Sequence, residues 1–215
     1  MNTDLGDYRK SYQKHELLEE NISDNPMEVF QNWFHEVDTN FNVGETNAMT
    51  ISTLGLDGYP KSRVVLLKKF TYEGFIFYTN YESEKGKAIA QNPNVCLSFF
   101  WPQAERQVII KGQAERIAEN LSDGYFESRP RGSQLGALVS NQSQPIENRE
   151  VLEEKLKSYE TKFKGKEIPR PKFWGGFIVK PVEIEFWQGR PNRLHDRIRY
   201  RLDEDFNWNI DRLAP

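Results

Sequence analysis

Between residues 48 and 117 the chain consists of short segments with alternating apolar and polar residues, separated by turn residues. Alternation with a period of two is typical of half-buried strands, and it predicts strands at residues 48–54, 60–70, 75–80, 95–101 and 107–117. The loop at 55–58, Gly-Leu-Asp-Gly, has the Asp-Gly chemistry of a hairpin turn. Successive strands joined by short turns predict an antiparallel meander, and closure into a barrel would protect its edges.

Segments with a helical period precede and interrupt these strands. One apolar stripe is formed by Val29, Phe30, Trp33, Phe34 and Val37. Asp24 or Asn25 can cap this helix, and Pro26 lies in its first turn. Further helices are predicted at residues 84–91, 121–128, 132–140 and 147–163. The fold class is therefore mainly β with helices (α+β). We expect one domain over residues 25–215, preceded by a mobile polar segment at 1–24.

The totals exclude several classes of protein. At 215 residues the chain suits one domain of good size. Hydrophobic residues make up 37% and the mean hydropathy is -0.75, and no apolar run is long enough to span a membrane. The first residues contain no apolar signal region, so we expect a cytoplasmic protein with no membrane association. A net charge of -3 argues against a general nucleic-acid binder, which would carry a broad basic face.

Cysteine and histidine give no sign of a redox or metal site. Cys96 is the single cysteine, so it has no partner for an internal disulfide, and its apolar context favours a small buried side chain. His15, His35 and His195 lie at no ligating interval from a cysteine or carboxylate. We therefore expect no metal.

The stretch at 173–201 combines an aromatic strand pattern with a basic cluster. Residues 173–187 read as a strand, in which Pro181 indicates a bulge or an edge. After the turn at 188–192, the chain brings several charged side chains close together: Arg193, His195, Asp196, Arg197 and Arg199. In an acidic chain such a cluster indicates a nearby anion, although a solvated basic loop explains the composition equally well.

Two further segments have the chemistry of a phosphate site. In RVVLLK at 63–68, Arg63 and Lys68 cannot share one strand face without a bulge or twist, but one or both can reach a phosphate from a strand end. The alternative is a barrel strand with snorkelling ends. A strand end at 78–80 then leads to Ser-Glu-Lys-Gly-Lys at 83–87, where the N-terminus of a helix can hold an anion.

A third segment, at 125–136, places a phenol, a guanidinium and a hydroxyl around a turn. Tyr125, Arg129 and Ser133 can bind a phosphate together through charge-assisted hydrogen bonds. The alternative is that Ser133 caps a helix and that the arginines are exposed. The spacing alone leaves both explanations open.

The strings Glu-Phe-Trp-Gln-Gly at 185–189 and Asn-Arg-Leu-His-Asp-Arg at 192–197 resemble the signature of the pyridoxine (pyridoxamine) 5′-phosphate oxidases. The closing Asp-Arg-Leu-Ala-Pro at 211–215 resembles the end of that family's chains. The resemblance implies an FMN-binding split antiparallel β-barrel that forms a homodimer with sites at the interface. It also implies oxidation of pyridoxine or pyridoxamine 5′-phosphate by O2 to pyridoxal 5′-phosphate, with release of H2O2.

The resemblance also implies roles for individual residues. The catalytic residues are Arg193 and His195. The substrate-binding residues are Arg9, Tyr12, Lys68, Tyr125, Arg129, Ser133, Arg193, Leu194 and His195. The cofactor-binding residues are Arg63, Val64, Leu66, Lys68, Tyr78, Thr79, Ser83, Lys85, Gln107, Gln142, Ser143, Trp187 and Arg197. Arg9 and Tyr12 make the segment at 1–24 a lid over the substrate.

One position departs from the family pattern and supports a rival function. Glu84 stands where the family usually has an arginine, which questions one phosphate contact. The rival is a non-catalytic flavin- or pyridoxal-phosphate-binding protein that has kept the barrel and lost turnover. The intact segment at 193–197 and the set Tyr125, Arg129 and Ser133 argue against it.

Overall fold

The computed structural model describes residues 3–215. Contacts within the chain cluster into two compact units. We call Met1–Thr50, Leu97–Lys111 and Pro181–Pro215 the terminal unit, and Ile51–Cys96 with Gly112–Lys180 the central unit. The predicted boundary at residue 25 and the single domain over 25–215 stay predictions.

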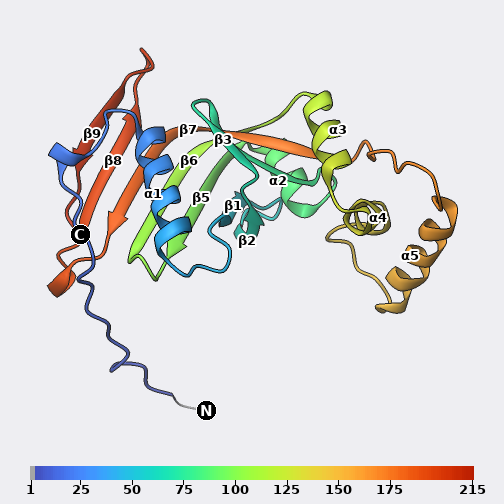
Figure 1. The fold of residues 1–215 in the computed structure, drawn as a ribbon, viewed down its shortest axis with the longest axis horizontal. Helices are drawn as coiled ribbons and strands as arrows, with labels where there is room; N and C mark the ends of the chain where they lie inside the picture. Colours follow the sequence, from blue (N-terminus) through green and yellow to red (C-terminus); the bar gives the residue numbers. More distant parts are fainter. Residues whose placement is uncertain (1–2) are drawn as a thin grey trace. The chain divides into compact units, whose positions relative to one another are not determined.

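Nine strands form one sheet in the described part of the chain. They are β1 Ala48–Leu54, β2 Pro60–Leu66, β3 Lys69–Thr71, β4 Gly74–Asn80, β5 Asn94–Trp101, β6 Arg106–Arg116, β7 Trp174–Gln188, β8 Asp196–Leu202 and β9 Trp208–Arg212. Their order is β2-β1-β5-β6-β7-β4-β3, with β8 on β7 and β9 on β8 (Figure 1). The β-rich class is confirmed, but the simple meander is wrong because β1 pairs with β5 and β4 pairs with β7. Turn chemistry fixes hairpins and not the pairing of distant strands.

In the terminal unit, helix α1 (Pro26–Asn40) covers the aromatic core. Asn25 is the cap, since its side-chain oxygen accepts a hydrogen bond from the N–H of Met27, and Pro26 opens the helix. Phe30 is fully buried, with its ring centroid 5.2 Å from that of Phe99 on β5. The predicted stripe therefore faces the core, and each such buried aromatic contributes about 2–3 kcal/mol.

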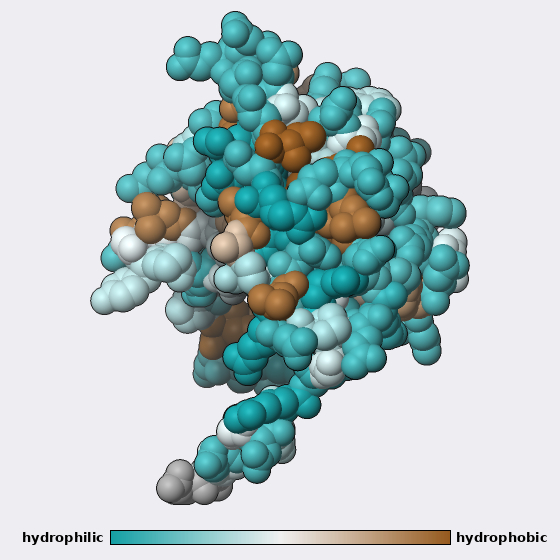
Figure 2. All heavy atoms as spheres, turned by 90° about the vertical axis from the view of Figure 1, so that its left-hand side faces the viewer, coloured by the Kyte–Doolittle hydropathy of each residue, from teal (hydrophilic) through white to brown (hydrophobic). Residues whose placement is uncertain are grey.

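Strands β8 and β9 extend the terminal unit beyond β7. Cross-strand partners share a face of a sheet, so Ile198 and Tyr200 point to one side and Arg197, Arg199 and Arg201 to the other. Ile198 and Tyr200 are fully buried, and burial raises the pKa of the Tyr200 hydroxyl. The side of the molecule that carries β8 and β9 is mainly hydrophilic, with isolated apolar side chains (Figure 2).

In the central unit, four helices accompany the strands (Figure 1). They are α2 Glu84–Gln91, α3 Glu119–Ser128, α4 Arg131–Val139 and α5 Glu150–Lys162, close to the predicted segments. Phe126 of α3, Leu135 of α4 and Trp174 at the start of β7 share one buried cluster. Tyr125 packs against this cluster, and Arg129 follows directly at the C-terminal end of α3.

Pro181 lies where strand β7 changes its neighbour. Pairing with β4 extends to Val179, and pairing with β8 begins at Glu183. Because proline has no N–H to donate, it is tolerated between two ladders. The expectation of a bulge or an edge at Pro181 fits this place. No helix in residues 3–215 is long and apolar enough to cross a membrane.

Candidate functional site: a cationic cavity and an aromatic cluster

The central unit contains a cavity of about 290 Å³. It is lined by nine of the predicted residues: Val64, Leu66, Lys68, Tyr78, Thr79, Lys85, Tyr125, Arg129 and Gln142. An adjoining cavity of about 270 Å³ is lined by Ser133 and shares Asn80, Arg129, Gln142 and Trp174 with the first. The break between β2 and β3 at Leu67 and Lys68 resolves the problem of strand alternation, because Lys68 is no longer part of a regular strand.

Aromatic rings form one wall of this cavity. The rings of Tyr78 and Tyr125 stack with centroids 3.9 Å apart, and Tyr78 lies 5.5 Å from Trp174 at an interplanar angle of 13°. The guanidinium of Arg129 lies over the Trp174 ring, 4.6 Å from its centroid. Flat stacked surfaces of this kind suit a planar ring ligand. The sequence analysis missed Trp174, for which the only signal was a tryptophan beside a predicted strand.

Arg129 is a cation without its full complement of acceptors. Its Nη1 is buried and has no hydrogen-bond partner among the described residues. Burial lowers the pKa of the Arg129 guanidinium, while the neighbouring Tyr125 opposes that shift. A buried donor without a partner is costly, and an anion that reaches Nη1 would recover that cost. Ser133 is not the cap of α4, since that position is taken by Pro130. The capping alternative for Ser133 is wrong.

Lys85 is a second buried cation on the same cavity. It is 8% exposed, and its Nζ donates to the hydroxyl of Thr79 at 3.3 Å. That hydroxyl donates in turn to Oε1 of Gln142, also at 3.3 Å. Burial and then the charge of Arg63 lower the pKa of Lys85, and Glu84 opposes the shift. The chain of hydrogen bonds links three predicted residues around one positive charge.

Arg63 and Ser83 do not line the cavity. The Nη1 of Arg63 donates to the hydroxyl of Thr53 at 2.8 Å, and burial lowers its pKa. The hydroxyl of Ser83 is fully buried, donates to the carbonyl of Asn80 and accepts from the N–H of Gly86, so it caps helix α2. The direct contacts predicted for Arg63 and Ser83 with a cofactor stay predictions.

Glu84, the residue that departs from the family pattern, forms an ion pair with Lys61. It is not among the residues that line the cavity. Its carboxylate raises the pKa of both Arg63 and Lys85, although burial outweighs this effect in each case. Glu84 therefore acts at a distance on the cations of this region.

In the terminal unit, three predicted residues form an aromatic cluster. The ring of Trp187 lies 4.7 Å from His195 and 5.7 Å from Tyr12, and Tyr12 lies 5.8 Å from His195. Nδ1 of His195 accepts a hydrogen bond from the N–H of Arg190 at 3.0 Å. The proton of the neutral imidazole is therefore on Nε2. Burial and then the charge of Arg193 lower the pKa of His195.

Arg193 is presented by a strained turn. Asn192 and Arg193 have φ values of 58° and 63°, in the left-handed region that costs about 1–2 kcal/mol for each residue with a side chain. Arg193 is exposed and has no ion-pair partner in the part of the chain that the structure describes. Leu194 is 68% exposed. Strain that holds an unpaired cation outward is typical of a functional site.

Arg197 is a fully engaged cation. Its Nε and Nη2 contact the two carboxylate oxygens of Glu185 at 2.8 and 3.1 Å, and Nη1 donates to the carbonyl of Ala214 at 2.8 Å. Glu185 raises its pKa. Trp187 and Arg197 are cross-strand partners, so their side chains share a face of the sheet.

The remaining predicted residues are not among those that line the two smaller cavities or form the aromatic cluster. Gln107 is half-buried on β6, and Ser143 has a φ of 70° in the loop after α4. Arg9 donates from Nε to the carbonyl of Gly6 and is not joined to the cluster of Tyr12, Trp187 and His195.

Among residues 3–215 no group of three or more histidine, cysteine, aspartate or glutamate residues can hold a metal ion.

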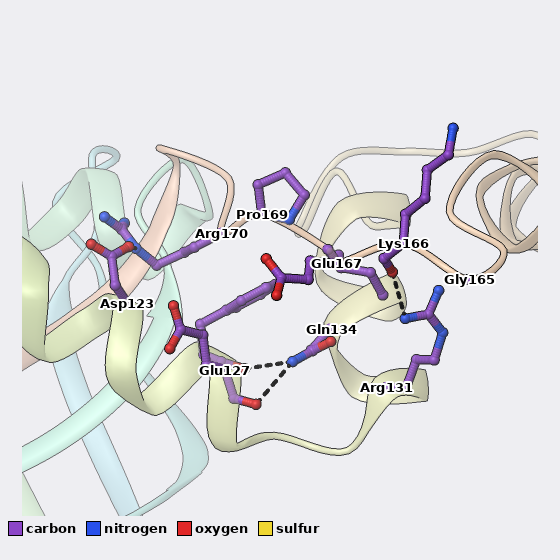
Figure 3. A pocket seen from close by; sticks show the side chains of 11 residues that line it. Asp123, Glu127, Arg131, Gln134, Gly165, Lys166, Glu167, Pro169 and Arg170 are labelled. Carbon is purple, nitrogen blue, oxygen red and sulfur yellow. Dashed lines mark hydrogen bonds and ion pairs between the residues drawn. The ribbon is translucent and has the colours of Figure 1, made fainter.

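A larger depression of about 990 Å³ lies beside α3, α4 and the loop before β7 (Figure 3). Several of its polar groups already have partners. Arg170 pairs with Asp123, Arg131 donates to the carbonyl of Lys166, and Gln134 donates to the carbonyl of Glu127. Size alone does not make this the site, because Arg129, whose buried Nη1 has no partner among the described residues, lines both smaller cavities.

The cavity of the central unit combines a stacked aromatic wall with a buried Arg129 Nη1 that has no partner among the described residues, and solved structures give the class of the fold. PhzG from Burkholderia lata, in complex with tetrahydrophenazine-1-carboxylic acid, superposes with a TM-score of 0.87 at 27% identity and covers 94% of this chain and 100% of its own. A pyridoxamine 5′-phosphate oxidase-related, FMN-binding protein from Nostoc punctiforme has a TM-score of 0.71 at 15% identity, over 90% of this chain and 100% of its own, which shows the fold alone. The fold is a split β-barrel.

The family follows from sequence comparison. Residues 35–163 match the pyridoxamine 5′-phosphate oxidase profile, and residues 174–215 match the pyridoxine 5′-phosphate oxidase C-terminal dimerisation region. The pyridoxine/pyridoxamine 5′-phosphate oxidase of Flavobacterium psychrophilum is 69% identical over 212 residues, which are 99% of each chain. That of a Nostoc species is 49% identical over 215 residues, the whole of both chains. The chain belongs to the pyridoxine/pyridoxamine 5′-phosphate oxidase family and is an oxidoreductase of this type. The match to the dimerisation region supports a homodimer.

Proposed function

We propose that this protein oxidises pyridoxine 5′-phosphate and pyridoxamine 5′-phosphate at C4′ to pyridoxal 5′-phosphate, with FMN as cofactor and O2 as electron acceptor. The observation that carries the proposal is the buried, unpartnered Nη1 of Arg129 beside Lys68 and Lys85 in one cavity. Arg129 and Lys85 are both partly desolvated, and neither has an ion pair among the described residues, which fits the phosphates that both ligands carry. The donor set therefore fits FMN and the phosphorylated substrates.

Residues of the central unit anchor phosphates. Lys68, Tyr125, Arg129 and Ser133 hold the substrate phosphate through charge-assisted hydrogen bonds. Lys85 and Thr79, which already share a hydrogen bond, hold the cofactor side together with Gln142. The exposed backbone of Val64 and Leu66 contributes contacts along the cavity.

Residues of the terminal unit act on the substrate ring. Arg193 supplies a positive charge, and His195 presents an Nε2–H because its Nδ1 is occupied by the N–H of Arg190. Trp187 and Arg197 serve the cofactor. The homodimer has its sites at the interface between copies, so that residues from both copies complete each site. Tyr12 and Arg9 close over the substrate.

Lys85, Thr79 and Gln142 would hold FMN, which would supply a two-electron acceptor for the hydride at C4′ and be reoxidised by O2 to give H2O2. For the alcohol, the substrate and O2 give the aldehyde and H2O2. For the amine, water is also consumed and ammonia is released. The protein orients both partners and excludes water around them.

Purification and an oxygen electrode test the proposal. The protein should be yellow, with about one non-covalent FMN per chain, and it should consume O2 when pyridoxine 5′-phosphate is added. Colourless protein that leaves the spectrum of added FMN unchanged contradicts the cofactor. Yellow protein that consumes no oxygen with either substrate supports the rival, a non-catalytic flavin- or pyridoxal-phosphate-binding protein. A cytoplasmic location stays a prediction.

A further inference from the structure

Glu105 is a buried carboxylate that binds the backbone of the N-terminal segment. It is 3% exposed, and its Oε2 accepts from the N–H of Gln13 at 2.8 Å and from the N–H of Lys14 at 3.1 Å. Its only ion pair among the described residues is a long one, with exposed Lys10 at 3.8 Å. One buried oxygen thus satisfies two successive backbone donors that lie 92 and 91 residues away in the chain.

The backbone of Glu105 is held as firmly as its side chain. Its φ of 56° is left-handed, which is unfavourable for glutamate. Its carbonyl accepts from the N–H of Gly189 at 2.8 Å and from Nε2 of Gln188 at 3.2 Å. A strained backbone that is fixed from the strand carrying Trp187 aims the carboxylate at the N-terminal segment.

Glu105 is the last strong tether before the start of the chain. After residues 13 and 14, the N-terminal segment has further long-range hydrogen bonds. The carbonyl of His15 accepts from Arg190, and the N–H of Leu17 donates to Asp196. Before residues 13 and 14, the hydrogen bonds of residues 3–11 are local, such as those of Gly6 and Arg9. The exception is the long ion pair between Lys10 and Glu105. The bonds that Glu105 makes to residues 13 and 14 therefore help to position Tyr12, together with the side chain of Lys14, whose Nζ donates to the carbonyl of Gln103.

The side chain of Tyr12 is in contact with neighbouring residues on several sides. Its ring contacts Trp187 and His195, as described above. A Cβ added to Gly189 would lie 2.7 Å from both Cβ and Cγ of Tyr12. The absence of a side chain at Gly189 therefore makes room for Tyr12. Glu105 and Gly189 are joined by a hydrogen bond and act on the same residue. Glu105 anchors the backbone next to Tyr12, and Gly189 leaves space for the Tyr12 side chain.

We propose that Glu105 is a positioning residue for the oxidase reaction, which acts by fixing the backbone at residues 13–14 so that Tyr12 lies on Trp187 and His195. This proposal rests on the proposed function for its effect on turnover. The anchoring of residues 13–14 by Glu105 can be tested independently of the proposed function, because the two backbone hydrogen bonds are measurable without substrate.

Hydrogen exchange of the FMN-loaded protein tests the anchor. Glu105→Asn withdraws the acceptor by one methylene while it suits the left-handed backbone, and Glu105→Gln keeps an acceptor at full length. The amides of Gln13 and Lys14 should exchange on the order of 10-fold faster in Glu105→Asn, the loss expected for hydrogen bonds to a charged group. Glu105→Gln should retain most of the protection of these two amides against exchange. Glu204→Gln, an exposed glutamate in the same unit, is the control.

Turnover tests the link to Tyr12. Glu105→Asn and Tyr12→Ala should each lower kcat/KM on the order of 10-fold, and the double variant should be no worse than the worse single variant. Gly189→Ala, which displaces Tyr12 without removing the Glu105 acceptor, should lower kcat/KM while residues 13–14 stay protected.

The outcomes separate the two proposals. Unchanged exchange of the two amides in Glu105→Asn overturns the anchor, whatever the activity. Faster exchange with fully additive losses in the double variant overturns the action through Tyr12. A wild-type protein without oxidase activity contradicts the proposed function, and the exchange result still decides whether Glu105 holds the segment.

Discussion

The paired arginines of the terminal unit differ from the cations that line the cavity of the central unit. In the terminal unit Arg197 contacts Glu185 through two nitrogens, and Arg212 pairs with both Glu19 and Asp196. In the central unit Arg129 and Lys85 line a cavity, and neither forms an ion pair with a carboxylate of residues 3–215. Carboxylates raise the pKa of Arg197 and Arg212, whereas burial lowers the pKa of Arg129 and Lys85.

This contrast distinguishes structural from ligand-binding cations. A paired guanidinium already has its hydrogen bonds, so an incoming anion must compete with a carboxylate. An unpaired buried cation costs stability until a ligand arrives. Arg129 in the central unit has the features of a ligand-binding cation, which fits its proposed role in phosphate binding. In the terminal unit, Arg193 is the exception, since it is unpaired but exposed, and it is suited to touching a ligand that is anchored elsewhere.

The largest expected effect is on turnover. Arg193→Ala and His195→Ala should each lower kcat by about 100-fold or more, because both residues are proposed to contact the substrate ring and not the cofactor. Their flavin content, measured by absorbance after gel filtration, should stay near that of the wild-type protein. Equal loss of flavin in both variants and in Arg197→Ala would contradict the division of roles.

Removal of an unpaired cation should act on substrate affinity. Arg129→Ala should raise KM for pyridoxine 5′-phosphate on the order of 100-fold with a smaller change in kcat, since a phosphate anchor holds the ground state and the transition state alike. Arg131→Ala is the matched control, because Arg131 is exposed and bonds to the carbonyls of Phe163 and Lys166. An unchanged KM in Arg129→Ala, with unphosphorylated pyridoxine accepted equally well, would sink this role.

Removal of a paired cation should have a mixed effect. Arg197→Ala should weaken FMN binding by about 10-fold and should also lower the unfolding temperature, because Glu185 is left without its partner. Glu185→Gln keeps an acceptor for Arg197 and should preserve most of the flavin affinity. Fluorescence titration of the apoprotein measures the affinity. Normal affinity in Arg197→Ala would restrict that residue to a structural role.

Glu84→Arg tests how far a charge outside the cavity reaches. We expect FMN to bind roughly 3-fold tighter at low salt, since the variant replaces a carboxylate by a cation near Lys85 and Arg63, and the gain should shrink as salt screens it. Glu84→Gln separates loss of the negative charge from gain of a positive one. Affinity that does not tighten at low ionic strength would show that position 84 does not sense the phosphate.

The smallest effect concerns the protonation of His195, whose pKa lies below the ordinary histidine value. Between the folded and unfolded pKa values the unfolded chain binds more protons. The stability that neutral His195 contributes is therefore complete above the unfolded pKa and is lost as pH falls through the folded pKa. NMR titration should show this low midpoint, and Arg193→Ala should raise it. A midpoint that does not respond to Arg193→Ala would exclude Arg193 as a cause.

Local sequence patterns predicted what local physics decides. The helix at 26–40 follows from one apolar stripe and a proline after a capping residue, and the strand at 174–188 was predicted within one residue at each end. The strand order was wrong, because the pairing of β4 with β7 joins segments about a hundred residues apart and no turn specifies it. Chain topology is the part that a short motif does not encode.

Residues with distinctive chemistry were predicted more easily than residues with distinctive surroundings. Arg129 and Lys85 were predicted because cations near a turn or a helix start indicate phosphate. Trp174 was missed as a cavity residue and Glu105 as an anchor, since each acts through neighbours that are distant in sequence. The left-handed turn at Asn192 and Arg193 was also missed, because neither residue is a glycine.

The stacked wall of the cavity also has an optical consequence. Of the five tryptophans in the sequence, Trp174 is the only one in the central unit. It lies beneath the charge of Arg129 and beside the ring of Tyr78. An anion that draws Arg129 toward itself changes the electric field at this indole, and the emission of Trp174 changes with it. In a variant that keeps only this tryptophan, the fluorescence of the apoprotein would measure ligand binding in the cavity, without a label and without turnover.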